Sequence, residues 1–129
     1  MENSLKKATI EMLCCLEGYH QLCKMLHWSA TVKSKHELTD DIDSKLLDFQ
    51  DELAEVCMGI IGGEKFGLGT LKTMLPSAKD MESMLKELED DVLAYKKRVG
   101  NEGVTCAIHS IVDEFLSQIE KWKYLNLFN

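Results

Sequence analysis

The stretch KHELTDDIDSKLLDFQDELAEVCMGII, residues 35–61, decides the fold. Its apolar side chains recur every three or four residues, which is the repeat of one face of an α-helix. Ser34 and Glu37 have the S-x-x-E spacing of a capping box, and Gly62-Gly63 suits a left-handed C-terminal cap. The sequence therefore predicts a helix over 35–61, with a buried stripe of Ile42, Leu46, Phe49, Leu53, Val56, Cys57 and Ile60.

A similar repeat occurs on the N-terminal side of this segment. It begins near Ser4, a candidate N-cap, and continues to about Trp28. The apolar stripe of this segment consists of Leu5, Thr9, Met12, Leu16, Tyr19, Cys23 and Leu26. We therefore expect a first helix that packs against the second across a short connection.

Two further helices are expected on the C-terminal side. Pro76-Ser77 opens the third, with Asp80 at the capping-box position, and it continues to Gly100. The last covers about 104–125, and residues 64–75 form a glycine-containing crossover in the middle of the chain. The pattern predicts an all-α fold, in which residues 1–129 form a single four-helix bundle domain with a short middle crossover.

Composition excludes several classes of function. A net charge of −7, with no Lys/Arg-rich tail or basic face, disfavours nucleic-acid binding. No apolar run is long enough to cross a bilayer, and the N-terminus has no secretory leader pattern. Five cysteines, an odd number within helical segments, are typical of reduced thiols. We expect a cytoplasmic protein that is not associated with a membrane.

One side of the predicted helix 35–61 carries polar groups that can bind a metal. His36, Asp40, Asp51 and Glu55 lie within about a quarter-turn of one another, nearly opposite the buried stripe. Apolar side chains share this side, namely Leu47, Ala54 and Met58. A solvated face would carry few of these, so we expect a second subunit to cover it.

Helix geometry separates these groups into two pairs. Asp40 and Asp51 lie about 16 Å apart along the helix axis, too far for one metal ion to bridge. Two antiparallel copies related by a two-fold axis near residues 45 and 46 bring His36 and Asp40 to the partner's Asp51 and Glu55. His27, just upstream, can join them. Imidazole and carboxylate ligands together suit iron or a similar first-row divalent metal.

These residues resemble the signature of the DNA-protecting starvation ferritins, the Dps family of mini-ferritins. The signature is a His-Trp, then His-Glu-x-x-Asp, then Asp-x-x-Ala-Glu, and the matching segments here are His27-Trp28, 36–40 and 51–55. The chain departs from the Dps family in lacking the Lys-rich tail that some members have, and its His-Trp followed by a nine-residue step from His27 to His36 is more similar to small ferritin-like proteins of tailed bacteriophages.

The resemblance implies a function as well as a fold. It implies a ferritin-like bundle whose inter-subunit site binds iron through His27, His36, Asp40, Asp51 and Glu55 and oxidises Fe(II) with peroxide or oxygen. Such a protein would be a homo-oligomer, would serve iron detoxification or oxidative-stress protection, and would accept zinc as a substitute metal. The cytoplasm of a bacterial or phage-infected cell is the expected location, with the virion as the alternative.

Other interpretations of the same residues remain. The carboxylates on helix 35–61 are also compatible with a solvated acidic face, and the bundle with a non-catalytic oligomer used for assembly or partner binding. His20, Cys23 and His27 share a helix face that zinc could accept, although packing roles are favoured for them and for His109. No hydrolase triad order or nucleotide-binding glycine loop is evident.

Overall fold

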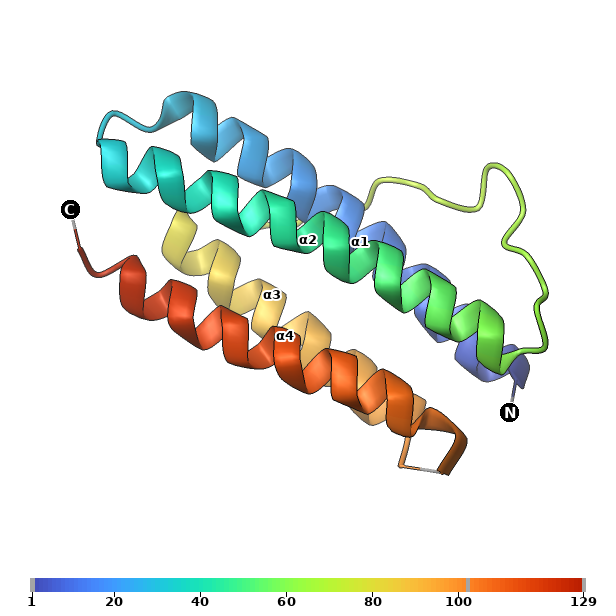
Figure 1. Cartoon of the computed structure of the whole chain (residues 1–129). Helices are drawn as coiled ribbons and strands as arrows, with labels where there is room; N and C mark the ends of the chain where they lie inside the picture. Colours follow the sequence, from blue (N-terminus) through green and yellow to red (C-terminus); the bar gives the residue numbers. More distant parts are fainter. Residues whose placement is uncertain (1, 102, 129) are drawn as a thin grey trace.

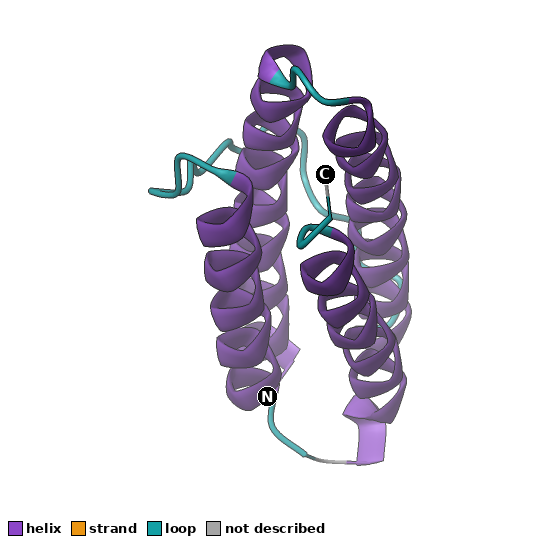
Figure 2. Cartoon of the chain, turned by 90° about the vertical axis from the view of Figure 1, so that its left-hand side faces the viewer, coloured by secondary structure: helices purple, strands orange, loops and turns teal. Residues whose placement is uncertain are grey.

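The computed structural model describes residues 2–101 and 103–128, with side chains described from Ser4 onward. The chain forms four long helices, α1 (Glu2–Ser29), α2 (Lys33–Ile60), α3 (Met81–Val99) and α4 (Cys106–Leu125), and one short 3-10 helix, η1 (Gly103–Thr105) (Figure 1). The described residues contain no strand (Figure 2). The predicted all-α class with four helical segments is therefore confirmed. None of the described helices has both the length and the hydropathy needed to cross a bilayer.

The helices form two antiparallel hairpins packed side by side. α1 pairs with α2 and α3 pairs with α4, while α1 also packs on α3 and α2 on α4. α2 and α3 run in the same direction, so the chain has to return along the whole bundle between them (Figure 1). The outer surface of the α1–α2 hairpin is left uncovered over much of its length.

The core lies between the two hairpins and receives apolar side chains from all four helices. Leu16, Leu53, Leu88 and Ile119 are each at most 1% exposed. Burying a side chain of this size stabilises the fold by about 1.5–3 kcal/mol. The rings of Phe49 and Phe115 stack with centroids 4.0 Å apart across the α2–α4 contact. The apolar stripes predicted for α1 and α2 therefore face the core.

The crossover between α2 and α3 lies against α1. The backbone N–H of Met74 donates to the carbonyl of Cys14 at 3.2 Å, and the Cys14 thiol donates to the carbonyl of Thr70 at 3.5 Å. Gly18 makes this approach possible, because a Cβ at that position would overlap the Met74 carbonyl group. The absence of a side chain at Gly18 therefore allows the crossover to pack directly on the helix backbone.

The predicted starts of the first two helices are wrong in detail. α1 begins at Glu2, so Ser4 lies within the helix, since no helix-breaking residue lies between them. α2 begins at Lys33 after the N-cap Val32, with no side-chain cap. The connection from α1 is short, and the carbonyl of Val32 already accepts the first helical bonds, so Ser34 falls in the first turn. The predicted Ser34–Glu37 capping box therefore does not form.

The third helix begins later than predicted, and the crossover is correspondingly longer. Asp80 is the N-cap of α3 and forms a capping box with Ser83, whose N–H donates to the Asp80 carboxylate at 2.8 Å. The Glu87 carboxylate accepts hydrogen bonds from the N–H groups of Ser77 and Ala78, which holds these residues outside the helix. The prediction that Pro76-Ser77 opens the helix is therefore wrong, as is the short crossover over 64–75.

Candidate metal site

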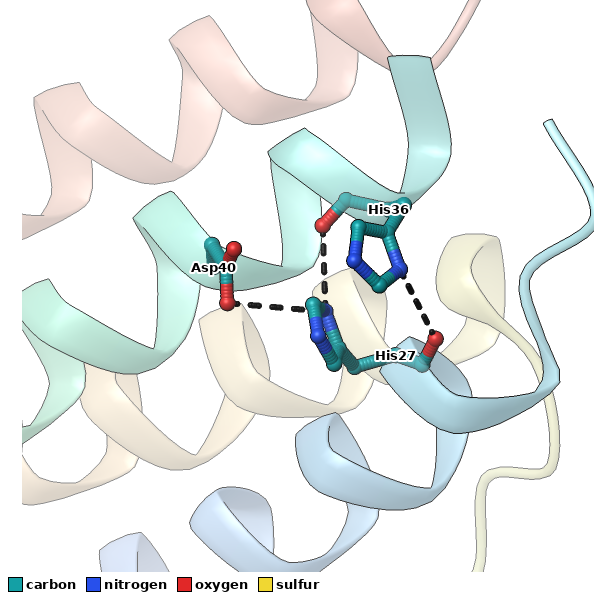
Figure 3. Close-up of side chains that lie close together, drawn as sticks. All are labelled: His27, His36 and Asp40. Carbon is teal, nitrogen blue, oxygen red and sulfur yellow. Dashed lines mark hydrogen bonds and ion pairs between the residues drawn. The ribbon is translucent and has the colours of Figure 1, made fainter. Parts of the chain in front are cut away.

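The end of α1 and the start of α2 bring three of the predicted ligands together. His27 lies in the last turn of α1, while His36 and Asp40 lie one turn apart at the start of α2. Because only residues 30–32 connect the helices, the two imidazole rings stack, with centroids 3.7 Å apart and an angle of 29° between their planes (Figure 3). Oδ1 of Asp40 lies 3.5 Å from Nδ1 of His27.

The spacing of these groups is close to what one metal ion needs. His27, His36 and Asp40 each offer one ligand atom, and the three atoms lie within 4.8 Å of one another. Bonds of about 2.0–2.2 Å to a first-row metal hold ligand atoms roughly 3–4 Å apart. His36 and Asp40 are exposed, so small rotations of their side chains would close the remaining gap. The three groups can therefore hold one ion, with coordination positions left open.

The hydrogen bonds of the two imidazoles leave one nitrogen of each ring available. Nδ1 of His27 donates to Oγ1 of Thr39 at 2.8 Å and faces the carbonyl of His36 at 3.1 Å. Nδ1 of His36 donates to the carbonyl of His27 at 3.3 Å (Figure 3). A ring that donates from Nδ1 keeps the lone pair on Nε2 for a metal. Each histidine thus fixes the tautomer of the other.

Thr39 orients His27, a role that the sequence analysis did not predict. Its hydroxyl donates to the carbonyl of His36 at 2.8 Å, so a lone pair of Oγ1 faces Nδ1 of His27. Thr39 is 1% exposed. The sequence did contain a signal for this role. Thr39 follows the candidate ligand His36 by three residues, and that spacing places two residues of a helix side by side.

Asp51 and Glu55 stand apart from the other predicted ligands. Both carboxylates are exposed farther along α2, and neither has a hydrogen bond or ion pair with another described residue. Asp51 lies about 16 Å from Asp40 along the helix axis. Within one chain, the structure therefore brings together His27, His36 and Asp40 but leaves Asp51 and Glu55 at a distance.

The alternative zinc set on α1 does not assemble. Nδ1 of His20 contacts the Asp43 carboxylate, and the Cys23 thiol is fully buried and donates to the carbonyl of Thr39 at 3.2 Å. Burial, with a smaller contribution from the nearby Asp43, raises the pKa of the Cys23 thiol to about 12. A metal-binding cysteine has to be a thiolate, so Cys23 is a packing residue here.

His109 lies on α4, away from the other histidines. It is half-buried, and its Nε2 has no hydrogen-bond partner among the described residues. Among those residues, His27, His36 and Asp40 are the one group of three or more ligating side chains close enough to share an ion. The candidate metal site is therefore confined to the α1–α2 end of the bundle.

The chain was compared with protein-family models, with curated proteins and with solved structures, and none of the three comparisons found a match.

Proposed function

We propose that this is a ferritin-like protein of the Dps type, which binds Fe(II) at a site shared by two copies of the chain and oxidises it with peroxide or oxygen. The observation that carries the proposal is the distribution of ligands on α2. Two oriented imidazoles and Asp40 meet at one end, and the two unpaired carboxylates Asp51 and Glu55 stand on the same side near the other end. The function would be iron detoxification or protection from oxidative stress.

The path of the chain supports the ferritin-like part of the proposal. Ferritin-like bundles have one long crossover between two antiparallel helix pairs. Here the long connection from Ile60 to Met81 joins two such pairs, and α2 and α3 are parallel. Simple up-and-down bundles have short loops throughout and lack this feature.

Two-fold symmetry supports the shared site. A two-fold axis perpendicular to α2, between the two chains at the level of residues 45 and 46, places Asp40 opposite the partner's Asp51 and His36 opposite the partner's Glu55. The same operation creates an equivalent second site. Each site then has two imidazoles and up to three carboxylates, and both unpaired acids of α2 acquire a partner.

The ligand set matches the chemistry of iron as a substrate. Imidazole and carboxylate both bind Fe(II), and the added carboxylates favour the harder Fe(III) product through their charge. Two ferrous ions each give one electron to one molecule of hydrogen peroxide, which takes up two protons and becomes two waters. The carboxylates of Asp51 and Glu55, which are exposed, would accept incoming Fe(II) and neutralise the charge gained on oxidation.

Anaerobic loading with Fe(II), followed by addition of peroxide or air, tests this function. The near-ultraviolet absorbance of Fe(III) should rise rapidly for the wild type, and at least about tenfold more slowly for His36→Ala and for Asp51→Ala, since each removes a ligand. Glu114→Ala, which removes an exposed carboxylate from α4, should behave as wild type. Equal rates for all four proteins would rule out the proposal.

A non-catalytic oligomer is the second candidate. It is favoured by the apolar side chain of Leu47, 42% exposed among the acids of α2, because such a residue suits assembly more than solvation. This alternative predicts a stable dimer in which the two ligand substitutions leave iron oxidation at the buffer rate.

A further inference from the structure

We propose that Trp28 of each chain inserts into a groove on a second copy of the chain and thereby anchors the two-fold dimer. The inference rests on the shared-site arrangement proposed above and adds to it a specific contact outside the set of metal ligands. Two observations carry it: an apolar groove beside α2, and an exposed tryptophan whose position matches that groove under the two-fold operation.

The groove lies on the outer surface of the α1–α2 hairpin, between α2 and the crossover. It encloses about 640 Å³, which is ample for an indole ring. Its apolar lining includes Ile10, Leu13, Leu47, Ala54, Phe66 and Leu68. Leu13 at the base of the groove is 5% exposed, whereas Leu68 is fully exposed and Leu47 is 42% exposed, so part of the groove's apolar wall is open to solvent in a single chain.

Trp28 is exposed on the same outer surface, toward the opposite end of the hairpin. Its side chain is 69% exposed, and it follows the metal-site residue His27 directly. Trp28 is eighteen residues after Ile10, which is five full turns of a helix, so both side chains leave α1 in the same direction. An indole in solvent leaves a large apolar area in contact with water, which favours its burial against a partner.

Contacts between α1 and α2 show where Trp28 and the groove lie along the length of the hairpin. His20 contacts Asp43, and Gln50 donates to the carbonyl of Leu13 and to Glu17 at 3.2 and 2.9 Å. Trp28 therefore lies beside the start of α2, whereas the groove lies beside its second half. In a helix the side chain leans toward the N-terminus, so the indole extends over the level of Asp40.

The two-fold operation places the indole over the groove. An axis between the facing surfaces, perpendicular to α2, stacks α1 on the partner's α1 and α2 antiparallel on the partner's α2. The level of Asp40 then faces the partner's Asp51, which lines the groove. The register that completes the metal site therefore also places Trp28 against the partner's groove.

Charge supports a second copy as the occupant. The exposed cations Lys24 and Lys33 lie at the Trp28 end of the hairpin, and the acids Asp48 and Asp51 line the groove. Antiparallel stacking places Lys24 of each chain over the acids that line the groove of the other. A parallel arrangement would instead place the groove acids Asp48 and Asp51 of the two chains against each other.

The dimer dissociation constant, measured by sedimentation equilibrium in buffer with EDTA, tests the inference without any metal. Trp28→Ala should raise this constant at least about tenfold, equivalent to about 1.4 kcal/mol, because a buried tryptophan is a typical interface anchor. Leu68→Asp, which places a charge in the wall of the groove, should also raise the dissociation constant. Leu93→Ala, which truncates an exposed apolar side chain on α3, is the matched control and should leave the constant unchanged.

Acrylamide quenching gives a second measurement. Trp122 is fully buried, so quenching reports on Trp28 and should decrease as the protein concentration is raised through the dimer range. A dissociation constant unchanged by Trp28→Ala, or a wild type that stays monomeric, would overturn the inference. If Trp28→Ala weakens the dimer while wild-type iron oxidation stays at the buffer rate, the ferroxidase proposal fails and the docking contact stands.

Discussion

Thr39 orients His27 without being one of the candidate metal ligands. Its hydroxyl bonds Nδ1 of His27 and the backbone carbonyl of His36, so it links the His27 imidazole to the backbone of α2. Spacing in the sequence predicted His27, His36 and Asp40 as neighbours, because helical periodicity and a short connection determine their placement. It did not predict Thr39, since the spacing of Thr39 from His36 is a weak signal and its contact with His27 depends on how α1 packs on α2.

We expect Thr39→Val to weaken metal binding about tenfold, because an orienting group of this kind typically contributes that much to affinity. Thr39→Ser, which keeps the hydroxyl, should restore binding. Competition with a chelating dye, using Zn²⁺ or Co²⁺ as the probe ion, measures the affinity. Equal affinities for the valine and serine variants would show that the hydroxyl does not orient His27.

Gly18 and Gly59 are two helical glycines for which the same substitution should have opposite effects. Alanine normally stabilises a helix by about 0.5–1 kcal/mol relative to glycine. Gly59 has open space around it, so Gly59→Ala should raise the free energy of unfolding by about 0.5 kcal/mol. Gly18→Ala should lower it, because the new methyl group would displace the crossover at Met74. Urea denaturation measures both, and a stabilising Gly18→Ala would contradict the close packing.

For the helices, the sequence specifies which segments are helical better than it specifies where each helix begins. Apolar periodicity predicted four helices, because burial of one face depends on residues throughout the segment. The starts of the helices were less accurate. Ser34 and Glu37 match a capping box, yet α2 starts at Lys33 because the connection from α1 is short. The start of α3 depends on Glu87, ten residues after Ser77, and no local motif reveals that contact.

The Glu87 carboxylate holds the residues that precede α3, so the stability of the fold should depend on the charge of Glu87. Burial acts to raise the pKa of Glu87, but hydrogen bonds from Ser77 and Ala78 outweigh it and hold the pKa below its usual value. A lowered pKa in the folded state means that the stabilisation is present above the ordinary glutamate pKa, roughly 4.3, and is lost as the pH falls through the lowered value.

Glu87→Gln should therefore lower the urea midpoint at pH 7, and its difference from wild type should shrink as the solution is acidified. Glu114→Gln on α4, an exposed acid with no hydrogen bond or ion pair to another described residue, is the control and should leave the midpoint nearly unchanged. A difference between Glu87→Gln and wild type that stays constant with pH would show that the carboxylate does not hold Ser77 and Ala78.

At the scale of the whole molecule, the fold separates two kinds of surface. The faces between the hairpins are buried in the core, whereas the outer surface of α1 and α2 carries the candidate metal ligands, an apolar groove and an exposed tryptophan. Helix periodicity alone predicted that the acids of α2 point away from the core. It could not predict the groove, because the crossover residues that form its second wall have no periodic pattern.

A mixing experiment tests most directly whether two chains share the site. His36→Ala and the double variant Asp51→Ala/Glu55→Ala, each expected to oxidise Fe(II) slowly alone, are co-expressed with different tags and purified through both. If ligands come from two chains, one site in each mixed dimer keeps every ligand, and Fe(II) oxidation should return to roughly a quarter to a half of the wild-type rate. A mixed protein no more active than either variant alone would contradict the shared site.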